Sequence, residues 1–166
     1  MEHQIAIYPG TFDPITYGHM DVVERATHLF SNVIVLVARN SSKSPLFSDD
    51  ERVSMIRHVF SHNRQVTVDG FEGLLVDYAL RKKSRVIIRG LRAVSDFEYE
   101  FQMALTNRKL ARKVDTIFLV PDERYTYLNS SIVREVARLG GDVTEFVPPH
   151  IKRLLLARVK ERHSHI

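Results

Sequence analysis

Short apolar runs of strand length alternate with segments of helical periodicity along this chain. Five runs rich in Val and Ile predict strands, at residues 5–7, 33–38, 66–68, 85–88 and 116–120. Apolar residues three and four positions apart predict helices, at residues 20–30, from the capping box 48–51, at 74–79, from the capping box 95–98 to about 111, from 130–131 to Gly140-Gly141, and at about 149–162. This alternation is typical of a parallel sheet whose strands are joined by helical crossovers.

The helical periodicity also predicts which side chains face the core. The expected inward positions are Val22, Val23, Ala26, Leu29 and Phe30 in the first helix, Val53, Ile56, Val59 and Phe60 in the second, and Phe101, Leu105 and Leu110 in the fourth. In the last helix, Ile151, Leu154, Leu155 and Val159 are expected to dock either on the core or on a neighbouring subunit. Because the strand at 33–38 is apolar throughout, we expect helices on both faces of the sheet.

The chain has 166 residues, a length at which one hydrophobic core is expected. No internal repeat, linker or low-complexity segment divides it. The sequence therefore predicts an α/β fold, with a single Rossmann-like domain over residues 1–166 and a five-stranded parallel sheet. In such sheets ligands bind outside the carboxyl ends of the strands, near the point where the strand order reverses.

The composition of the chain indicates in which compartment the protein is expected and which kinds of partner and site it lacks. The chain has no cysteine, which excludes disulfides, thiolate metal sites and thiol nucleophiles. Met1 to Gln4 leads into the first strand without a signal-peptide pattern, and no apolar run approaches the roughly 20 residues of a membrane span. The net charge of +4 is concentrated in residues 150–166, where a solvated helix face accounts for it. We expect a cytoplasmic protein that binds neither membrane nor nucleic acid.

The segment from Tyr8 to His19 carries the strongest chemical signal. It joins the first strand to the first helix through a Gly/Pro loop, a geometry that points backbone N–H groups and the positive end of the helix dipole at a bound anion, most often phosphate. The loop lacks both the GxGxxG and the GxxxxGK[ST] spacing, which excludes dinucleotide-binding and Walker-type sites. His19 either contacts the anion or only caps the helix.

Further candidate binding residues follow the other predicted strands at the same edge of the sheet. They are Lys43 after the second strand, Gly70 to Leu75 after the third, Arg89 and Arg92 after the fourth, and Ser130 and Ser131 after the fifth. Such a rim suits a ligand with several phosphates, although single arginines are also typical of any surface, and Leu74 and Leu75 of a helix core. The sequence shows no Ser-His-Asp or Cys-His arrangement and no metal-ligand spacing, so direct phosphoryl-type transfer is favoured over covalent catalysis.

These motifs resemble those of a known enzyme family. Thr16-Tyr17-Gly18-His19 resembles the T/HxGH signature of the nucleotidyltransferase superfamily. Together with Arg89-Gly90-Leu91-Arg92-Ala93, Asp96-Phe97-Glu98-Tyr99-Glu100 and the segment from Ser130 to Ala137, it resembles the bacterial phosphopantetheine adenylyltransferase family, in order through nearly the whole chain. The resemblance implies an enzyme that transfers the AMP moiety of ATP to 4′-phosphopantetheine, giving dephospho-coenzyme A and pyrophosphate, without a covalent intermediate.

The resemblance also implies roles for individual residues. The catalytic residues would be His19, as the transition-state stabiliser, with Lys43 and Arg92. The ATP-binding residues would be Thr11, Phe12, His19, Gly90, Leu91, Arg92, Glu100, Tyr125, Thr126, Tyr127, Leu128, Asn129, Ser130 and Ser131. Thr11, Lys43, Leu75 and Arg89 would bind phosphopantetheine. Mg²⁺ would arrive with ATP, and no protein side chain is expected to bind a metal.

One position departs from the family pattern, and other interpretations stay open. The family's Ile-Ser-Ser-Ser appears as Leu128-Asn129-Ser130-Ser131, which leaves the contact to ATP at this loop less defined. The family further implies a homohexamer and feedback inhibition by coenzyme A. The alternatives are a sister adenylyltransferase acting on another small phosphate, such as nicotinamide mononucleotide, and a non-catalytic nucleotide or nucleic-acid binder. The length and the absence of a KMSKS-like loop exclude an aminoacyl-tRNA synthetase.

Overall fold

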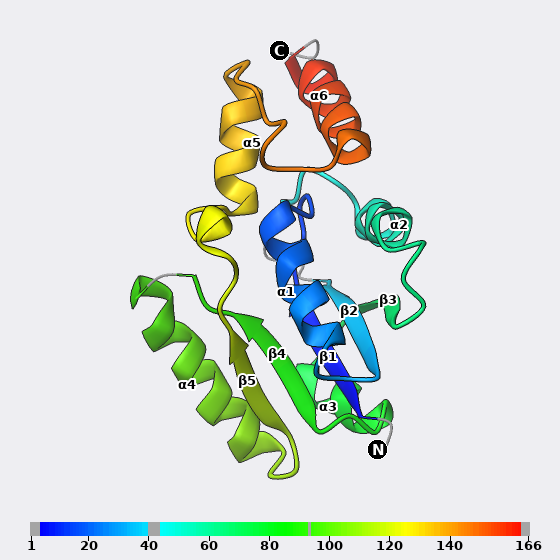
Figure 1. The fold of residues 1–166 in the computed structure, drawn as a ribbon, viewed down its shortest axis with the longest axis vertical. Coiled ribbons are helices and arrows are strands. Elements are labelled where there is room, and N and C mark those ends of the chain that lie inside the picture. Colours follow the sequence, from blue (N-terminus) through cyan, green and yellow to red (C-terminus); the bar gives the residue numbers. More distant parts are fainter. Residues whose placement is uncertain (1–3, 40–43, 93, 164–166) are drawn as a thin grey trace.

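A central parallel sheet organises the computed structural model, which describes residues 4–39, 44–92 and 94–163 (Figure 1). Its strands are β1 (Ile5–Gly10), β2 (Asn32–Ala38), β3 (Val66–Phe71), β4 (Val86–Gly90) and β5 (Asp115–Leu119). All neighbouring pairs are parallel, in the order β3-β2-β1-β4-β5. The predicted five-stranded Rossmann-like sheet is therefore confirmed, and its strand order reverses between β1 and β4.

Three strands extend further toward the rim than predicted, and the first of them is β1, which continues from Ile7 to Gly10. β3 continues through Asp69 and Gly70, and β4 through Arg89 and Gly90, residues that resemble turn sequences. Ladder pairing keeps them extended, since Asp69 lies opposite Leu36 of β2. Arg89 is likewise paired within the sheet, and its backbone is fixed rather than part of a loop.

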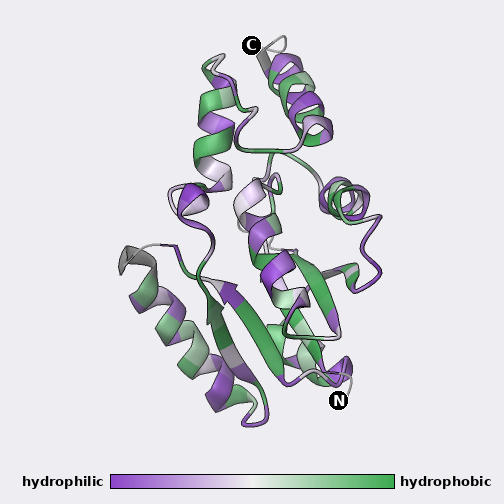
Figure 2. Cartoon of the chain, in the orientation of Figure 1, coloured by the Kyte–Doolittle hydropathy of each residue, from purple (hydrophilic) through white to green (hydrophobic). Residues whose placement is uncertain are grey.

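Helices cover both faces of the sheet, as the sequence predicts. They are α1 (Tyr17–Thr27), α2 (Asp49–Val59), α3 (Leu75–Arg81), α4 (Val94–Leu110), α5 (Ser130–Arg138) and α6 (Pro149–His163), with a 3₁₀ turn η1 (Glu123–Tyr125). Alternate residues of β1 enter separate cores: Ala6 packs in the cluster that includes Val23 of α1, whereas Ile7 packs with Val76 of α3. Figure 2 shows the central strands as mostly hydrophobic, consistent with burial on both sides.

The first helix differs from its predicted limits at both ends. It begins at Tyr17, three residues earlier than expected, because Thr16 and His19 form a capping box. It ends at Thr27, so Leu29 lies beyond it and is 60% exposed, contrary to the predicted inward position.

The predicted inward face of α4 is wrong. Phe101, Leu105 and Leu110 are all exposed, and the helix starts one residue before the expected N-cap Ser95. Its inward stripe instead comprises Glu100, Ala104 and Asn107, continuing to Ala111 just after the helix. This stripe has helical spacing but contains polar residues, so hydrophobic periodicity selects the opposite face.

The C-terminal helices agree more closely with expectation. Gly140 has φ +78° and ends α5, with its N–H donating to the Ala137 carbonyl, while Gly141 donates to Val136. This is the Schellman arrangement indicated by the Gly-Gly pair. Leu155 of α6 is fully buried in the core, so α6 docks on its own domain. Across the described ranges, no helix is both long and apolar enough to cross a membrane.

Candidate active site

The loop after β1 is shaped by an aromatic ring packed back over the strand end. Phe12 has φ +48° and is buried, in edge contact with Tyr8 at 5.4 Å and with His19 at 5.1 Å between ring centroids. A Cβ on Gly10 would lie 2.7 Å from the Phe12 ring, so only glycine allows this packing. Burial raises the pKa of the Tyr8 phenol, which lines the pocket and is neutral at physiological pH, to about 12.

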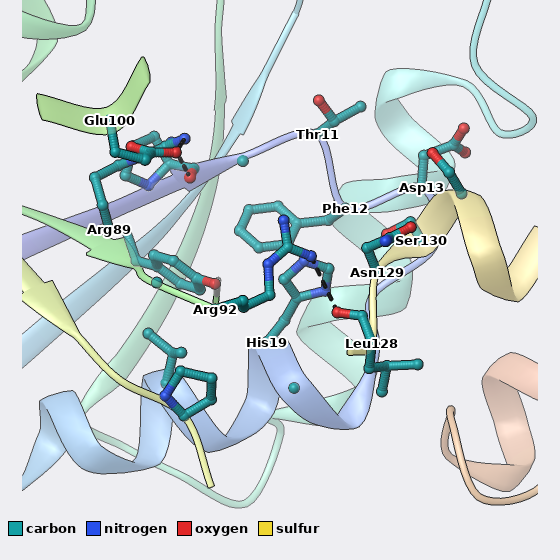
Figure 3. A pocket seen from close by; sticks show the side chains of 18 of the residues that line it. Thr11, Phe12, Asp13, His19, Arg89, Arg92, Glu100, Leu128, Asn129 and Ser130 are labelled. Atoms are coloured by element: carbon teal, nitrogen blue, oxygen red, sulfur yellow. Dashed lines mark hydrogen bonds and ion pairs between the residues drawn. The ribbon is translucent and has the colours of Figure 1, made fainter. Parts of the chain in front are cut away.

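His19 is held in a defined orientation by Thr16. The Thr16 N–H donates to His19 Nδ1 at 3.1 Å, and the Thr16 hydroxyl lies 3.0 Å from the same nitrogen. Because Nδ1 accepts the backbone N–H, the proton of the neutral ring resides on Nε2. His19 thus caps the helix and also has a second ring nitrogen with which to donate to an anion in the pocket (Figure 3).

We expect His19 to remain neutral in the ligand-free protein at physiological pH. Burial first, and then the positive charges of Arg92 and Arg89, lower the pKa of His19 from 6.5 to about 3. Since the unfolded chain takes up this proton at higher pH, His19 disfavours the folded state progressively as pH falls from 6.5 toward 3. Nitrogen-15 NMR should find the Nε2–H tautomer at pH 7 and no titration down to pH 5. A midpoint near 6.5 would contradict the assigned geometry.

Two arginines reach the pocket from the end of β4 and use their guanidinium groups differently. Arg89 donates through Nε and Nη2 to both carboxylate oxygens of Glu100, at 2.7 and 2.6 Å, and through Nη1 to the Pro9 carbonyl at 3.1 Å. Arg92 donates from Nη1 to the Leu128 carbonyl at 3.0 Å, near the pocket centre (Figure 3). In this state Glu100 directs its carboxylate at Arg89 and fixes that side chain.

The N-terminus of α5 closes another side of the pocket. Asn129 caps the helix, since its Oδ1 accepts the Ile132 N–H at 2.9 Å, and the Ser130 hydroxyl donates to the Pro14 carbonyl at 2.8 Å. The first N–H groups of a helix lack intrahelical partners and attract anions. Asn129 therefore performs the capping that a serine performs at many helix starts, which preserves the donor end of α5.

These groups surround a cavity of about 490 Å³ at the strand-order reversal. Of the residues singled out from the sequence, it is lined by Thr11, Phe12, His19, Arg89, Gly90, Arg92, Glu100, Leu128, Asn129, Ser130 and Ser131. Leu91, Tyr125, Thr126 and Tyr127 do not line it, and Leu75 lies in an adjoining cavity of about 110 Å³ beside Arg89 and Glu100. Leu74 is 56% exposed, and Lys43 lies outside the described residues.

Two charged lining residues had no role assigned from the sequence. Asp13 is 2% exposed, although it carries a carboxylate, and Arg134 pairs with it at 3.4 Å. Arg134 also donates to the Asp13 carbonyl, and to the Ser131 hydroxyl at 3.2 Å. Both residues lie within motifs singled out from the sequence, and this position could have identified them as candidate site residues. Arg134 also lies three residues after Ser131, and so on the same side of the helix.

Taken together, the pocket offers fixed positive charge and oriented N–H donors and is suited to stabilising phosphates. The described ranges contain no group of three or more His, Cys, Asp or Glu arranged to hold a metal. A pocket of this kind, with a TxGH helix start at the reversal of a parallel sheet, is typical of a nucleotidyltransferase domain. Residues 7–136 match the family described as Cytidylyltransferase-like.

Curated relatives identify a more specific family within this group. The chain is 55% identical to the phosphopantetheine adenylyltransferase of Geobacter sulfurreducens, over 93% of this chain and 94% of the relative. It is 52% identical to that of Lawsonia intracellularis, over 98% and 95%. The chain belongs to the phosphopantetheine adenylyltransferases, within the cytidylyltransferase-like family.

A solved structure supports the same fold. Plasmodium falciparum nicotinic acid mononucleotide adenylyltransferase, in a complex with NaAD, superposes with a TM-score of 0.65 at 16% sequence identity. The comparison covers 97% of this chain and 96% of that one.

Proposed function

We propose that the protein transfers AMP from ATP to 4′-phosphopantetheine, giving dephospho-coenzyme A and pyrophosphate. A phosphate oxygen of phosphopantetheine attacks the α-phosphorus of ATP, and the bond from that phosphorus to the bridging oxygen of pyrophosphate breaks in line. The observation that carries the proposal is the convergence of His19, Arg89, Arg92 and the α5 N-terminus on one cavity. The 55% identity to a phosphopantetheine adenylyltransferase supports the choice of acceptor.

Charge neutralisation is the main chemical task of this pocket. Two phosphate charges 4 Å apart repel by about 1 kcal/mol in water and about 4 kcal/mol near a protein surface. We assign Arg89 and Lys43 to the attacking phosphate, and Arg92 with the N–H groups of α5 to the ATP phosphates. The His19 Nε2–H donates to the oxygens of the reacting phosphorus, where negative charge increases. Holding both substrates in line lowers the activation barrier by up to ~7 to 11 kcal/mol.

The smaller cavity suits the pantetheine arm. It adjoins the Arg89–Glu100 pair and is lined by Leu75, Met103 and Asn107, which combine apolar surface with an amide. A phosphate placed at Arg89 has its pantetheine chain leading into this cavity. We also propose feedback inhibition by coenzyme A, whose own pantetheine arm would occupy the same cavity.

Assembly and environment complete the proposal. Phe97, Phe101 and Leu105 of α4 are 44 to 49% exposed, a hydrophobic surface suited to packing against further copies of the chain. We propose that these copies form a homohexamer in the cytoplasm, and that Mg²⁺ enters the site bound to ATP. Sedimentation equilibrium at several protein concentrations tests the assembly.

Pyrophosphate release from MgATP tests the function. The purified protein is assayed with 4′-phosphopantetheine, with unphosphorylated pantetheine and with nicotinamide mononucleotide. Release with 4′-phosphopantetheine alone is the expected result. Release with nicotinamide mononucleotide instead indicates a sister adenylyltransferase, and ATP binding without turnover indicates a binding protein.

Replacing Lys43 by alanine should chiefly impair use of the acceptor. Removing one charge-assisted contact to its phosphate is expected to raise the KM for 4′-phosphopantetheine about tenfold, with a small change in the KM for ATP. Steady-state kinetics with each substrate varied in turn measures both constants. Lys113→Ala removes an exposed lysine elsewhere and serves as the control. Equal changes in the two KM values would reject the assignment of Lys43.

A further inference from the structure

The segment Pro45-Leu46-Phe47 lies between the loop after β1 and the C-terminal helix α6, and polar contacts hold it from both sides. The Leu46 and Phe47 side chains are buried in the main core. Their backbone N–H groups face inward to one partner, and the carbonyl groups of Pro45 and Leu46 face α6. We refer to Pro45–Phe47 as the clamped segment.

On the inner side, the partner is the Asp13 carboxylate. Its Oδ2 accepts the Leu46 N–H at 2.8 Å, and its Oδ1 accepts the Phe47 N–H at 3.0 Å. The same carboxylate pairs with Arg134, whose guanidinium also reaches Ser131. Asp13 therefore links the clamped segment to two walls of the pocket, its own loop and the N-terminus of α5.

On the outer side, the partners are arginines of α6. Arg158 donates from Nη1 to the Leu46 carbonyl at 2.9 Å, and its guanidinium lies 4.9 Å from the centre of the Phe47 ring. Arg158 also forms an ion pair with Glu51 of α2, and Arg162 donates to the Pro45 carbonyl at 3.3 Å. Arg158 itself does not line the pocket.

These contacts form one continuous connection from α6 to the phosphate site. It runs from Arg158 through the clamped segment to Asp13, and from Asp13 through Arg134 to Ser131. Each carbonyl or N–H contact in it is charge-assisted, so each resists displacement more than a neutral hydrogen bond. The basic side chains Arg158 and Arg162 of α6 thus have a defined structural partner, the clamped segment.

We propose that Arg158 is a remote positioning residue of the phosphate site, which acts through the clamped segment and Asp13 to set the spacing between the loop after β1 and the N-terminus of α5. This inference rests on the proposed function, because it assumes that the pocket binds the phosphates of ATP and pyrophosphate. Loss of Arg158 is expected to weaken anion binding although Arg158 makes no contact with the anion.

Calorimetric titration with inorganic pyrophosphate, in the presence of Mg²⁺, tests the connection without requiring turnover. Arg158→Met retains an unbranched stem over Phe47 but cannot donate to Leu46 or Glu51, and it should raise the Kd for pyrophosphate about threefold to tenfold. Asp13→Asn cannot accept both N–H groups through carboxylate oxygens, and its Kd should rise at least as much. Arg153→Met, an exposed arginine on the same helix, is the matched control and should bind as the wild type does.

The double variant separates positioning from general destabilisation. If Arg158 acts through Asp13, the Kd of Asp13→Asn with Arg158→Met should equal that of Asp13→Asn alone, whereas independent effects multiply. Multiplied effects, or wild-type affinity in Arg158→Met, would overturn the proposal. If a variant fails to fold, Arg158→Lys and Asp13→Glu are measured in the same way. Absence of pyrophosphate binding by the wild type would instead overturn the proposed phosphate site itself.

Discussion

Replacing His19 by alanine is expected to lower kcat by about 100-fold to 1000-fold, the loss typical of removing one oriented donor to a transition-state oxyanion. The KM for ATP should change far less, because the proposed Nε2–H contact strengthens as charge develops on the reacting phosphate. Steady-state kinetics with 4′-phosphopantetheine at saturation measures both constants. Thermal unfolding should accompany the assay, because the ring also contributes to the capping box with Thr16.

A histidine on the same helix provides the control for this prediction. His28 is the exposed C-cap residue of α1 and does not line the pocket, so His28→Ala should retain wild-type kcat. His19→Asn is a useful companion variant, because its amide keeps a donor of similar polarity. A proportionate loss of kcat and ATP affinity in His19→Ala would exclude a role specific to the transition state.

The second large effect is expected at Arg89. Arg89→Met should lower kcat/KM for 4′-phosphopantetheine by about 100-fold, since it removes a charged donor from the attacking phosphate. It should also lower the free energy of unfolding by about 2 to 3 kcal/mol, because the mostly buried Glu100 carboxylate loses its partner. Urea denaturation and steady-state kinetics measure the two losses separately.

Combining Arg89→Met with Glu100→Gln distinguishes the two contributions. Neutralising the unpaired carboxylate should recover part of the stability and none of the activity. Arg108→Met breaks the Arg108–Asp115 pair, in which both side chains are more than 60% exposed, and should cost at most about 1 kcal/mol. If Arg89→Met behaves like Arg108→Met in both measurements, the Arg89–Glu100 pair has no special role.

The sheet and most of the pocket follow from local patterns in the sequence. Val- and Ile-rich runs identify the five strands, and the carboxyl ends of parallel strands necessarily share one edge, so the residues that follow them gather there. The Gly140-Gly141 pair and the Ser48–Glu51 capping box predict helix ends because these signals act within a few residues.

What local patterns miss depends on contacts between distant residues. The inward face of α4 contains Glu100 and Asn107 because Glu100 must reach Arg89 and both residues line the smaller cavity, a requirement invisible to hydrophobic periodicity. Asp13 lies in a loop where carboxylates are usually solvated, yet it is buried because two N–H groups 33 and 34 positions away need an acceptor. Tyr125, Thr126 and Tyr127 do not line the larger cavity, and their assignment to ATP binding stays a prediction.

The strand order has a consequence for how the molecule acquires its activity during synthesis. β1 is the first strand to be made and the central one in the sheet, so β2 can add to one of its edges, and β3 to β2, in the order of translation. The other edge of β1 is paired only after β4 has been made, and α5, which forms one wall of the pocket, is made later still. A nascent chain that has completed β3 therefore contains the loop and His19 but neither arginine. The complete pocket can therefore form only after β4 and α5 have been made.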